Sequence, residues 1–485
     1  MLKVIGGEQE GEFKAIASGA LPDGKPVIIN SDGTVSVVAL ESQTESVGSP
    51  TIFETGQSDL YTHSATFDPS TNRVVIAYTD NANSQYGTVV VGTATSSSIS
   101  FGTPVVFNSL ITEGISCAYD ANAQKVVIAY DNNGSSSDGT AIVGTVSGTS
   151  ISFGTPVVFD SGVIEFTAIA YDSDSQKVVI AYSDRNIADG AAVVGTVSGT
   201  SISFGSQTSF DSNLIKAPSV VYDTNAQKIV VAYSRDDVND YGYAAVGTVS
   251  GTSISFGTSV AFDTDGVITD TDLVYDTIAQ KVVVVYRNNT TYGRAKVGTV
   301  SGTSISFGSA TTFSGGNLNE PTASYDANAQ KVVVAYRDRT VTPNAGKVTV
   351  GTVSGTSISF TTPTQYEAGE SNFNPSTYDS NVQRVIIAYR DDNDVEKSKA
   401  LVYRTPYSRT NLTSENYIGI SSGGTVADAG NSTVDIIGTV NKAQTGLTAG
   451  QQYFVQQNGT LSTTADDPSV LAGTAISATD LVVKT

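Results

Sequence analysis

The sequence predicts an all-β protein: a seven-bladed β-propeller of four-stranded blades, closed by an N-terminal strand and flanked by a small β-domain. Two repeated phrases indicate this fold, and no stretch shows a convincing helical period. The phrase GTVSGTSISF occurs five times letter for letter. The phrase YD…QKVVIAY recurs every 50 to 53 residues, in copies that begin at Phe67, Tyr119, Tyr171, Tyr222, Tyr275, Tyr325 and Tyr378.

Each repeat is predicted to form four strands separated by turn residues. In the third copy these strands are Phe166–Tyr171, Lys177–Tyr182, Ala191–Val197 and Ile202–Phe210. The second strand, KVVIAY, is apolar at successive positions, which suits a strand covered on both faces. Because such a sheet is not stable alone, we expect neighbouring repeats to stack and bury both faces.

The ends of the repeat region favour a closed ring over the rival architecture, an open solenoid. The seventh repeat lacks a fourth strand, whereas Gly48–Phe53, ahead of the first repeat, matches the fourth-strand text Gly154–Phe159 without a gap. We therefore expect the early segment to complete the last sheet and lock the ring.

The predicted domains are an N-terminal β-module (1–40), the propeller (41–404) and a C-terminal β-module (405–485). Ala20–Ser36 and Gly446–Ser462 align without gaps, and each contains an Asp-Gly or Asn-Gly hairpin signal. The two modules are therefore related, either as one compact domain or as two similar ones.

Composition excludes several functions. The 26 Lys and Arg against 47 Asp and Glu give a net charge of −21, which disfavours nucleic-acid binding. One Cys and one His exclude an internal disulfide and Cys- or His-rich metal sites. No apolar run is long enough to span a membrane. The start of the chain resembles no secretory signal, so if the protein acts outside a cell, we expect it to get there without a recognisable N-terminal signal.

The two faces of the predicted ring differ. The turns between strands one and two, and between three and four, are nearly uniform. The loops between strands two and three, and the links from strand four to the next strand one, differ in every repeat; we call this side the varied face. Its loops are Thr79–Gly87, Asp131–Gly139, Ser183–Gly190, Ser234–Gly242, Arg287–Gly293, Arg337–Gly346 and Arg390–Lys397. Its links are Glu54–Tyr61, Asn108–Gly114, Asp160–Glu165, Asp211–Ala217, Asp263–Asp270, Ser314–Glu320 and Glu367–Asn374. When repeats of one chain differ from each other on one face only, that face often serves in recognition. The alternative is that these loops have changed freely because nothing constrains their sequence.

Charged residues just after strand two are the candidate binding residues of the varied face. They are Arg185, Arg235, Asp236, Arg287, Arg337, Asp338, Arg390 and Asp391. They predict a polar ring for a sugar or an anionic glycan. The alternative, which the sequence favours, is that these residues form Arg–Asp pairs between neighbouring loops.

No metal or other cofactor is expected. Two acidic turns, Asp391–Asp394 with Glu396 and Asp263–Gly266, faintly resemble Ca²⁺ loops but lack the full ligand spacing. The Asp that ends each first strand is interpreted as a turn-initiating residue. Cys117 falls in a core position, and we expect His63 to be structural rather than catalytic.

The terminal segments resemble a known group of proteins. The text GLTAGQQYFVQQNGTLSTTADDPSVLAGTAISATDLVV looks like a module at the ends of bacteriophage tail-fibre and related virion proteins. The text FKAIASGALPDGKPVIINSDGTVSVV is similar to lead-in segments of marine phage structural proteins, and the repeat also resembles those of phage proteins.

That resemblance implies a virion component of the tail, made in the host cytoplasm without a signal peptide. Its expected partners are other virion or tail proteins and a host-surface glycan, with homo-oligomerisation, and it transfers no catalytic residues. We therefore expect a non-enzymatic structural protein. The alternatives are a propeller glycosidase or polysaccharide depolymerase, which needs two carboxylates ~5–10 Å apart, and a non-viral scaffold propeller.

Overall fold

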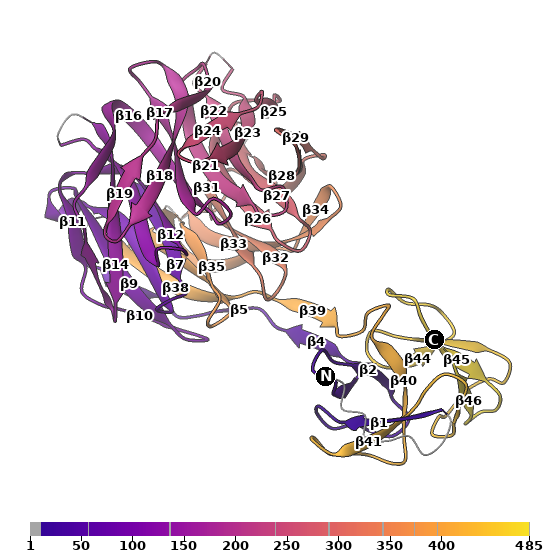
Figure 1. Cartoon of the computed structure of the whole chain (residues 1–485). Helices are drawn as coiled ribbons and strands as arrows, with labels where there is room; N and C mark the ends of the chain where they lie inside the picture. Colours follow the sequence, from indigo (N-terminus) through magenta and orange to yellow (C-terminus); the bar gives the residue numbers. More distant parts are fainter. Residues whose placement is uncertain are drawn as a thin grey trace. The chain divides into compact units, whose positions relative to one another are not determined.

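The computed structural model describes residues 11–56, 58–134, 137–237, 239–289, 292–341, 344–372, 374–394 and 396–484, without the side chains of residues 58–62. The chain divides into two compact units: unit 1 is Met1–Thr44 with Pro406–Thr485, and unit 2 is Glu45–Thr405. In the described ranges the one helical element is a 3₁₀ turn, η1 (Asn81–Asn83), and all named strands pair antiparallel (Figure 1). The predicted all-β class is confirmed.

The first two strands of every repeat form a hairpin around the uniform Asp turn. The first strands are β7 (Ser58–Asp68), β12 (Glu113–Asp120), β16 (Val157–Asp172), β21 (Ile215–Asp223), β26 (Ile268–Asp276), β31 (Leu318–Asp326) and β36 (Ser376–Asp379). The second strands are β8 (Arg73–Asp80), β13 (Lys125–Asn132), β17 (Lys177–Asp184), β22 (Lys228–Arg235), β27 (Lys281–Asn288), β32 (Lys331–Asp338) and β37 (Arg384–Asp391). The second strands are buried on both faces, as expected; Val178–Tyr182, for example, is fully buried.

The third strands are continuous, whereas the fourth strand of each repeat is broken into two pieces. The third strands are β9 (Tyr86–Ala94), β14 (Asp138–Ser147), β18 (Asp189–Ser198), β23 (Gly242–Ser250), β28 (Tyr292–Ser301), β33 (Ala345–Ser354) and β38 (Lys397–Arg404). The fourth-strand pieces are β10 (Ile99–Phe101), β11 (Val105–Ile111), β15 (Ser150–Phe153), β19 (Ser201–Phe204), β20 (Thr208–Asp211), β24 (Ser253–Phe256), β25 (Val260–Asp263), β29 (Ser304–Phe307), β30 (Thr311–Ser314), β34 (Ser357–Phe360) and β35 (Thr364–Asn372). In the second repeat the outer piece runs on into the next first strand as β16.

The break in the fourth strand corrects the prediction of one strand over Ile202–Phe210. In the third repeat Phe204 pairs with Gly195, and Thr208 pairs with Ala192. The fourth strand thus holds one residue more than the third strand between these two pairs, which is a β-bulge.

A glycine at each break packs against the next repeat. The N–H of Gly205 donates to the carbonyl of Val194 at 3.0 Å. A Cβ on Gly205 would lie 1.8 Å from the carbonyl oxygen of Thr252, which belongs to the following hairpin. The same close approach to the following hairpin recurs at Gly102, Gly154, Gly257 and Gly308. Only a residue without a side chain fits between two stacked repeats here.

The N-terminal segment of unit 2 takes the fourth-strand place in the seventh repeat. Its strands β5 (Ser46–Val47) and β6 (Thr51–Glu54) pair with β38. Gly48 donates its N–H to Val402 at 2.8 Å, and a Cβ on Gly48 would lie 2.4 Å from the carbonyl oxygen of Ser97 in the first repeat. Both contacts reproduce those of the glycines within the other repeats. The pairing predicted for this segment is therefore present.

Apolar cores lie between successive repeats. Val127 and Val143 of the second repeat, for example, pack with Val178 and Val193 of the third. The corresponding cluster that holds Ile76 of the first repeat also contains residues of the early segment and of the seventh repeat: Phe53, Ile386, Ala388, Ala400 and Val402. The first strands of neighbouring repeats also contact one another, including β36 with β7. In Figure 1 the labels of β7, β12, β21, β26 and β31 lie toward the middle of unit 2.

Two side-chain devices recur in the repeats. The Asp at the end of each first strand accepts an N–H from two or three residues further on, which agrees with its interpretation as a turn initiator; these residues are Asp68, Asp120, Asp172, Asp223, Asp276, Asp326 and Asp379.

A buried Tyr near the end of the second strand donates to a carboxylate at the end of a fourth strand. Tyr182, for example, donates to Asp160 at 3.0 Å.

Unit 1 is built from both terminal segments. One sheet has the order β1-β41-β40-β2-β3, with bounds Glu12–Ile16, Asn431–Asp435, Tyr417–Ser422, Pro26–Ile29 and Val35–Val37. The other has the order β42-β46-β45-β43-β44, with bounds Val440–Asn441, Leu481–Val483, Val470–Ala475, Gln452–Val455 and Leu461–Ser462. A further pair joins β4 (Leu40–Gln43) to β39 (Tyr407–Thr410).

The two aligned segments of unit 1 form the same hairpin. Gly33 and Gly459 both adopt a left-handed backbone, with φ of 83° and 75°. Each follows an Asx residue whose side chain accepts the N–H of a Thr, from Thr34 to Asp32 and from Thr460 to Asn458. No helix in the described part of the chain is long and apolar enough to cross a membrane.

Candidate functional site

The loops and links of the varied face lie against each other in the structure. In six repeats the N–H of a loop residue donates to the carbonyl of a link residue, at distances of 2.7 to 3.1 Å. The pairs are Gly134 with Ile111, Arg185 with Val163, Asp236 with Leu214, Asn289 with Val267, Arg339 with Asn317, and Asp392 with Glu370. Both sets of diverging residues therefore lie on one side of unit 2.

The first strands are irregular where they begin at this face. In β12 Glu113 pairs with Asp131 but Ser116 pairs with Ala129, so the first strand holds an extra residue. The equivalent residue of four repeats has a left-handed backbone, with φ between 44° and 55°: Gly114, Phe166, Ala217 and Glu320. For the three that carry side chains this conformation is strained, and strain of this kind collects at functional sites.

These four residues with a left-handed backbone line a cavity of about 360 Å³ at the start of the first strands. A second cavity of about 390 Å³ continues along the first strands and is lined by residues of all seven repeats. The two cavities share wall residues, among them His63, Thr167 and Thr271. Both volumes lie in the range of small-molecule sites, about 300–1,000 Å³.

His63 lies in the wall of both cavities. Neither of its ring nitrogens is accessible to solvent, and neither has a hydrogen-bond partner among the described residues. The ring stacks on Tyr78, with 5.9 Å between centroids and 12° between planes. Burial, with a smaller contribution from the charge of Arg390, lowers the pKa of His63 to about 3. The imidazole is therefore neutral at physiological pH, with one donor and one acceptor to offer.

Hydroxyl groups and one carboxylate supply the polar wall of the deeper cavity. Asp272 accepts hydrogen bonds from the Ser219 hydroxyl and from the N–H of Ala323, both at 2.8 Å. Burial raises the pKa of Asp272, against the opposing effect of these two donors. Ser116 and Thr167 share a hydrogen bond of 2.8 Å between neighbouring repeats.

Cys117 also lines the deeper cavity and belongs to the core between the first two repeats. It is 8% exposed, and burial raises the pKa of its thiol to about 12. It is a small core side chain, as the sequence predicts.

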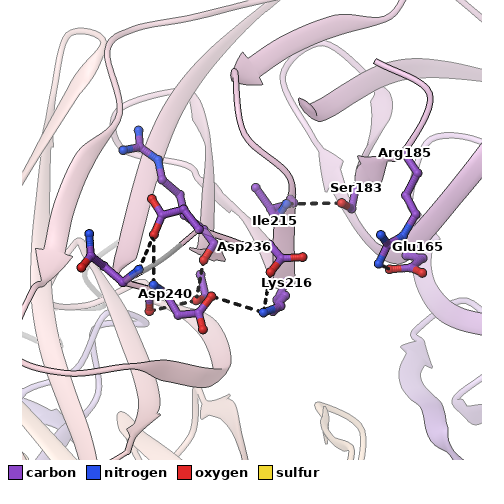
Figure 2. Close-up of polar contacts among 11 residues, drawn as sticks. Glu165, Ser183, Arg185, Ile215, Lys216, Asp236 and Asp240 are labelled. Atoms are coloured by element: carbon purple, nitrogen blue, oxygen red, sulfur yellow. Dashed lines mark hydrogen bonds and ion pairs between the residues drawn. The ribbon is translucent and has the colours of Figure 1, made fainter. Parts of the chain in front are cut away.

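The charged residues that were predicted to form a binding ring on the varied face instead form ion pairs with other residues of this chain. Figure 2 shows Arg185 facing Glu165, and Lys216 between Asp236 and Asp240. The Arg185 pair spans 2.5 Å, and Lys216 lies 2.6 Å from Asp236.

Figure 2 also shows a hydrogen bond between the third and fourth repeats: the N–H of Ile215 donates to the Ser183 hydroxyl at 3.3 Å. These contacts join loops to their neighbours on the varied face.

Arg235 contacts both an acidic and an aromatic side chain. Its Nε donates to the buried Asp211 at 2.8 Å, and its guanidinium lies 3.6 Å from the ring centre of Tyr243. The other predicted residues are paired as well: Arg287 with Asp270, Arg337 with Glu370, Arg390 with Asp392, Asp338 with Lys347, and Asp391 with Lys399. These residues are therefore paired rather than free. Their partners lie in the same loop, as for Arg390 and Asp392, or in the adjoining link or third strand, rather than across neighbouring loops, which is the arrangement that the sequence favours.

Both acidic turns considered for Ca²⁺ have other partners. Asp391 and Asp394 pair with Lys399, and Asp263 accepts from the Tyr286 hydroxyl at 2.6 Å. In the described ranges no group of three His, Cys, Asp or Glu side chains is arranged to hold a metal ion.

Asp131 stands apart from the paired carboxylates. It is 4% exposed, and its Oδ1 has no hydrogen-bond partner in the described structure. Burial, followed by the charges of Glu113, Glu165 and Asp138, raises the pKa of Asp131 to about 7. This carboxyl group is therefore half-protonated near neutral pH.

No family model matches the chain, and no curated protein does either. Solved structures are similar in fold. The BP39L lectin from Burkholderia pseudomallei has a TM-score of 0.54 at 10% identity, and the match covers 78% of this chain and 99% of that chain. The Cps50 (Swd1) β-propeller domain of Myceliophteria thermophila has a TM-score of 0.47 at 9% identity, with 75% and 100% covered. A chain of the mitotic checkpoint complex gives 0.45 at 8%, with 74% and 94%.

Of these three, the lectin has a TM-score above 0.5, and its likeness agrees with the repeated all-β architecture of this chain. At such low identity the likeness concerns the fold alone.

The central cavity is the feature that sequence reasoning missed. Its wall comes from two or three positions in each of seven separate repeats, so it has no single local motif. One signal was present: at the aligned position the repeats carry His63, Ile115, Thr167, Pro218, Thr271, Pro321 and Asn374. A position that carries five residue types in seven copies, beside uniform strands, indicates a surface free of the packing that constrains the other positions.

Proposed function

We propose that this chain is a β-propeller recognition protein whose seven repeats close into a ring and whose varied face binds a host-surface glycan. Closure is supported by the pairing of β6 with β38 and by the contact of β36 with β7. The shared core of Ile76 and Val402 supports it as well. Seven first strands around one cavity give the ring its centre.

The observation that carries the recognition role is the cavity at the varied face. Its wall differs in every repeat, while the opposite turns are uniform, and four of its residues have the same left-handed backbone. A scaffold of repeats that differ at one common opening suits recognition of a single asymmetric ligand.

The place in a phage tail rests on the resemblance of the terminal segments. Unit 1, which contains both segments in shared sheets, would anchor the chain to other tail proteins or to further copies of itself. Cross-linking in purified particles tests this placement. If the chain is recovered from host lysate but never from particles, the place in the tail is rejected and the alternative of a non-viral scaffold propeller is supported.

Binding of the full-length chain to a glycan array and to host cells tests the recognition role. We expect binding to a restricted set of glycans. Absence of glycan and cell binding, together with cross-links from the varied face to a virion protein, would assign this face to assembly.

A hydrolase is a second candidate, because Asp131 has the raised pKa of a general acid and Glu113 is its cross-strand neighbour. Incubation with host capsule separates the two functions. Release of oligosaccharide that is lost in Asp131→Asn would identify a hydrolase, whereas binding without release supports recognition.

A further inference from the structure

The cavity at the centre of the varied face has more negative than positive groups in its wall. Its outer and deeper parts share wall residues. The charged residues of this wall are three carboxylates and one ammonium group: Asp270, Asp272, Glu320 and Lys216. Lys216 already pairs with two further carboxylates. A cleft lined mainly by one sign of charge attracts ligands of the opposite sign, so the wall favours a cation.

Asp272 lies in the deeper part of the cavity and accepts hydrogen bonds from neutral groups. Oδ1 accepts from the Ser219 hydroxyl at 2.8 Å and from the N–H of Leu273 at 2.9 Å. Oδ2 accepts from the N–H of Ala323 at 2.8 Å. Within the described structure Asp272 forms no ion pair, in contrast with Asp270, which pairs with Arg287. Its charge therefore has no counter-ion in the protein, which is unfavourable for an enclosed carboxylate.

The carboxylate of Asp272 has room for one more donor. Each carboxylate oxygen can accept two hydrogen bonds, and of the described residues Ala323 alone donates to Oδ2. Asp272 is half-buried and lines the deeper cavity, so the surface that it retains faces that space. A donor that carries a positive charge would find both an acceptor and a counter-ion there.

An acid at this position is not required to hold the neighbouring strand. The aligned residue of the fourth repeat is Ser219, whose hydroxyl accepts the N–H of Leu273 in the next repeat at 3.0 Å. Asp272 makes the same contact with Ala323. The remaining copies are also uncharged: Ser64, Ser116, Ala168, Thr322 and Pro375. Because a hydroxyl is sufficient for the structural contact, the carboxylate of the fifth repeat points to a ligand.

The other wall groups suit a ligand that has hydroxyl and C–H groups besides the charge. Ser116 and Ser219 line the deeper part, whereas Phe166, which is 42% exposed, lines the outer part. Apolar walls with a few polar groups are typical of small-molecule sites. We propose that the cavity binds the protonated amino group of an amino sugar, with Asp272 as its counter-ion. This inference rests on the proposed glycan recognition and names the class of sugar.

His63 reports whether the cavity is occupied, because it lines both parts and is the one histidine of the chain. Full-length protein labelled with ¹³C at histidine would be titrated separately with glucosamine, N-acetylglucosamine, glucose and butylamine. Glucosamine should shift the ring signals in a saturable way, with an affinity about tenfold or more above that of the other three. No shift with glucosamine, or equal affinity for N-acetylglucosamine, overturns the inference. Equal affinity for butylamine removes the sugar from it.

Variants assign the counter-ion. Asp272→Asn keeps the shape of the side chain and removes its charge, so the affinity for glucosamine, measured by calorimetry, should fall about tenfold or more. Asp174→Asn is the matched control, because it removes a carboxylate from an exposed turn between a first and a second strand, and it should leave the affinity unchanged. If Asp272→Asn does not fold, Asp272→Ser takes its place and copies Ser219. Unchanged affinity in the folded variant would refute the role of Asp272.

Failure of this inference and failure of the proposed function give different results. Array binding to glycans without a free amino group, unchanged in Asp272→Asn, keeps recognition and removes the amino sugar from the cavity. Glucosamine binding that is lost in Asp272→Asn, while neither glycans nor host cells bind the full chain, keeps the cavity site and removes the recognition role.

Discussion

At the scale of single residues, the varied face concentrates polar groups whose environment opposes their charged form. His63 and Asp131 are buried without the partners that would stabilise their ions. One is therefore a neutral base and the other a carboxyl group held partly protonated. Both affect how the free energy of unfolding depends on pH.

His63 predicts a loss of stability in mild acid. Its folded-state pKa of about 3 lies below the unfolded value of ~6.5. The unfolded chain therefore takes up a proton first as the pH falls. Between pH 7.5 and pH 5 the free energy of unfolding should decrease by about 2 kcal/mol more in the natural protein than in His63→Ile. Urea titrations at both pH values measure this difference. Parallel changes in the two proteins would contradict the low pKa.

Asp131 predicts the opposite dependence. Its raised pKa of about 7 means that the unfolded state ionises first, so that stability decreases as the pH rises from ~4 to 7. Asp131→Asn should stabilise the protein at pH 8 by roughly 2–4 kcal/mol and have little effect near pH 4. Asp131→Ser, which copies Ser183 of the third repeat, is a second variant. Destabilisation by both at pH 8 in urea titrations would exclude the buried acid.

Removing the hydroxyl of the tyrosine near the end of the second strand should reduce the free energy of unfolding in one repeat but not in another. Tyr182→Phe removes the donor to Asp160 and should cost about 1.5–3 kcal/mol. Tyr130→Phe is the matched control, because the amide of Asn108 stands there in place of the carboxylate and bonds Thr112 and Asn132 instead. The control should stay within about 0.5 kcal/mol. Thermal unfolding compares them, and equal losses would show that the carboxylate is not the reason.

At the scale of elements, the sequence identified each strand of the repeat but not the division of the fourth. Val178–Tyr182 is apolar throughout, which is sufficient to predict a doubly covered strand. The bulge after Phe204 depends instead on the hairpin of the following repeat, which approaches Gly205. Glycine at that position is visible in the sequence, yet its reason is a contact with residues about fifty positions further on.

Gly48 tests whether the early segment is docked in the same way. Gly48→Thr places a side chain against the carbonyl of Ser97 and should destabilise unit 2 by about 1–3 kcal/mol. Gly154→Thr should cost a similar amount. Thr361 occupies this position naturally in the sixth repeat, since the seventh repeat has no hairpin to approach it. If Gly48→Thr leaves calorimetric unfolding unchanged while Gly154→Thr lowers its midpoint, the segment does not fill this place.

At the scale of the whole molecule, some junctions between repeats make a hydrogen bond that others lack; the hydroxyls of Tyr222 and Tyr325, for example, have no hydrogen-bond partner in the described structure. The hydroxyls of Tyr171, Tyr275 and Tyr378 each accept an N–H from the turn of the preceding repeat. The first repeat carries Phe67 instead, beside Val382 of the seventh. The junction between the last and first repeats therefore lacks a bond made at other junctions.

Phe67→Tyr should supply that bond. In the proposed ring the new hydroxyl would face the N–H of Asn381, the counterpart of Asn225. We expect an increase of about 0.5–1.5 kcal/mol in the free energy of unfolding. Hydrogen exchange should also become slower in the seventh turn. A variant that is less stable, with unchanged exchange in this turn, would argue against the neighbourhood of the two repeats.

The sequence could predict the repeat, its turns and the partner of the early segment, because each depends on residues close together or on a matching text. It could not place His63 beside Thr167 and Thr271, which come from different repeats. Nor could it show that Arg235 is held by Asp211 and Tyr243 rather than free. Such features depend on how the repeats pack rather than on any one of them.

Unit 1 contains the first and the last strands of the chain, and β1 pairs with β41 in one sheet. Because Glu12 pairs with Asp435, tension applied between the two ends loads the same end of both strands and must peel them apart before it can reach any of the repeats. Under mechanical load, unit 1 would yield first and leave the repeats intact.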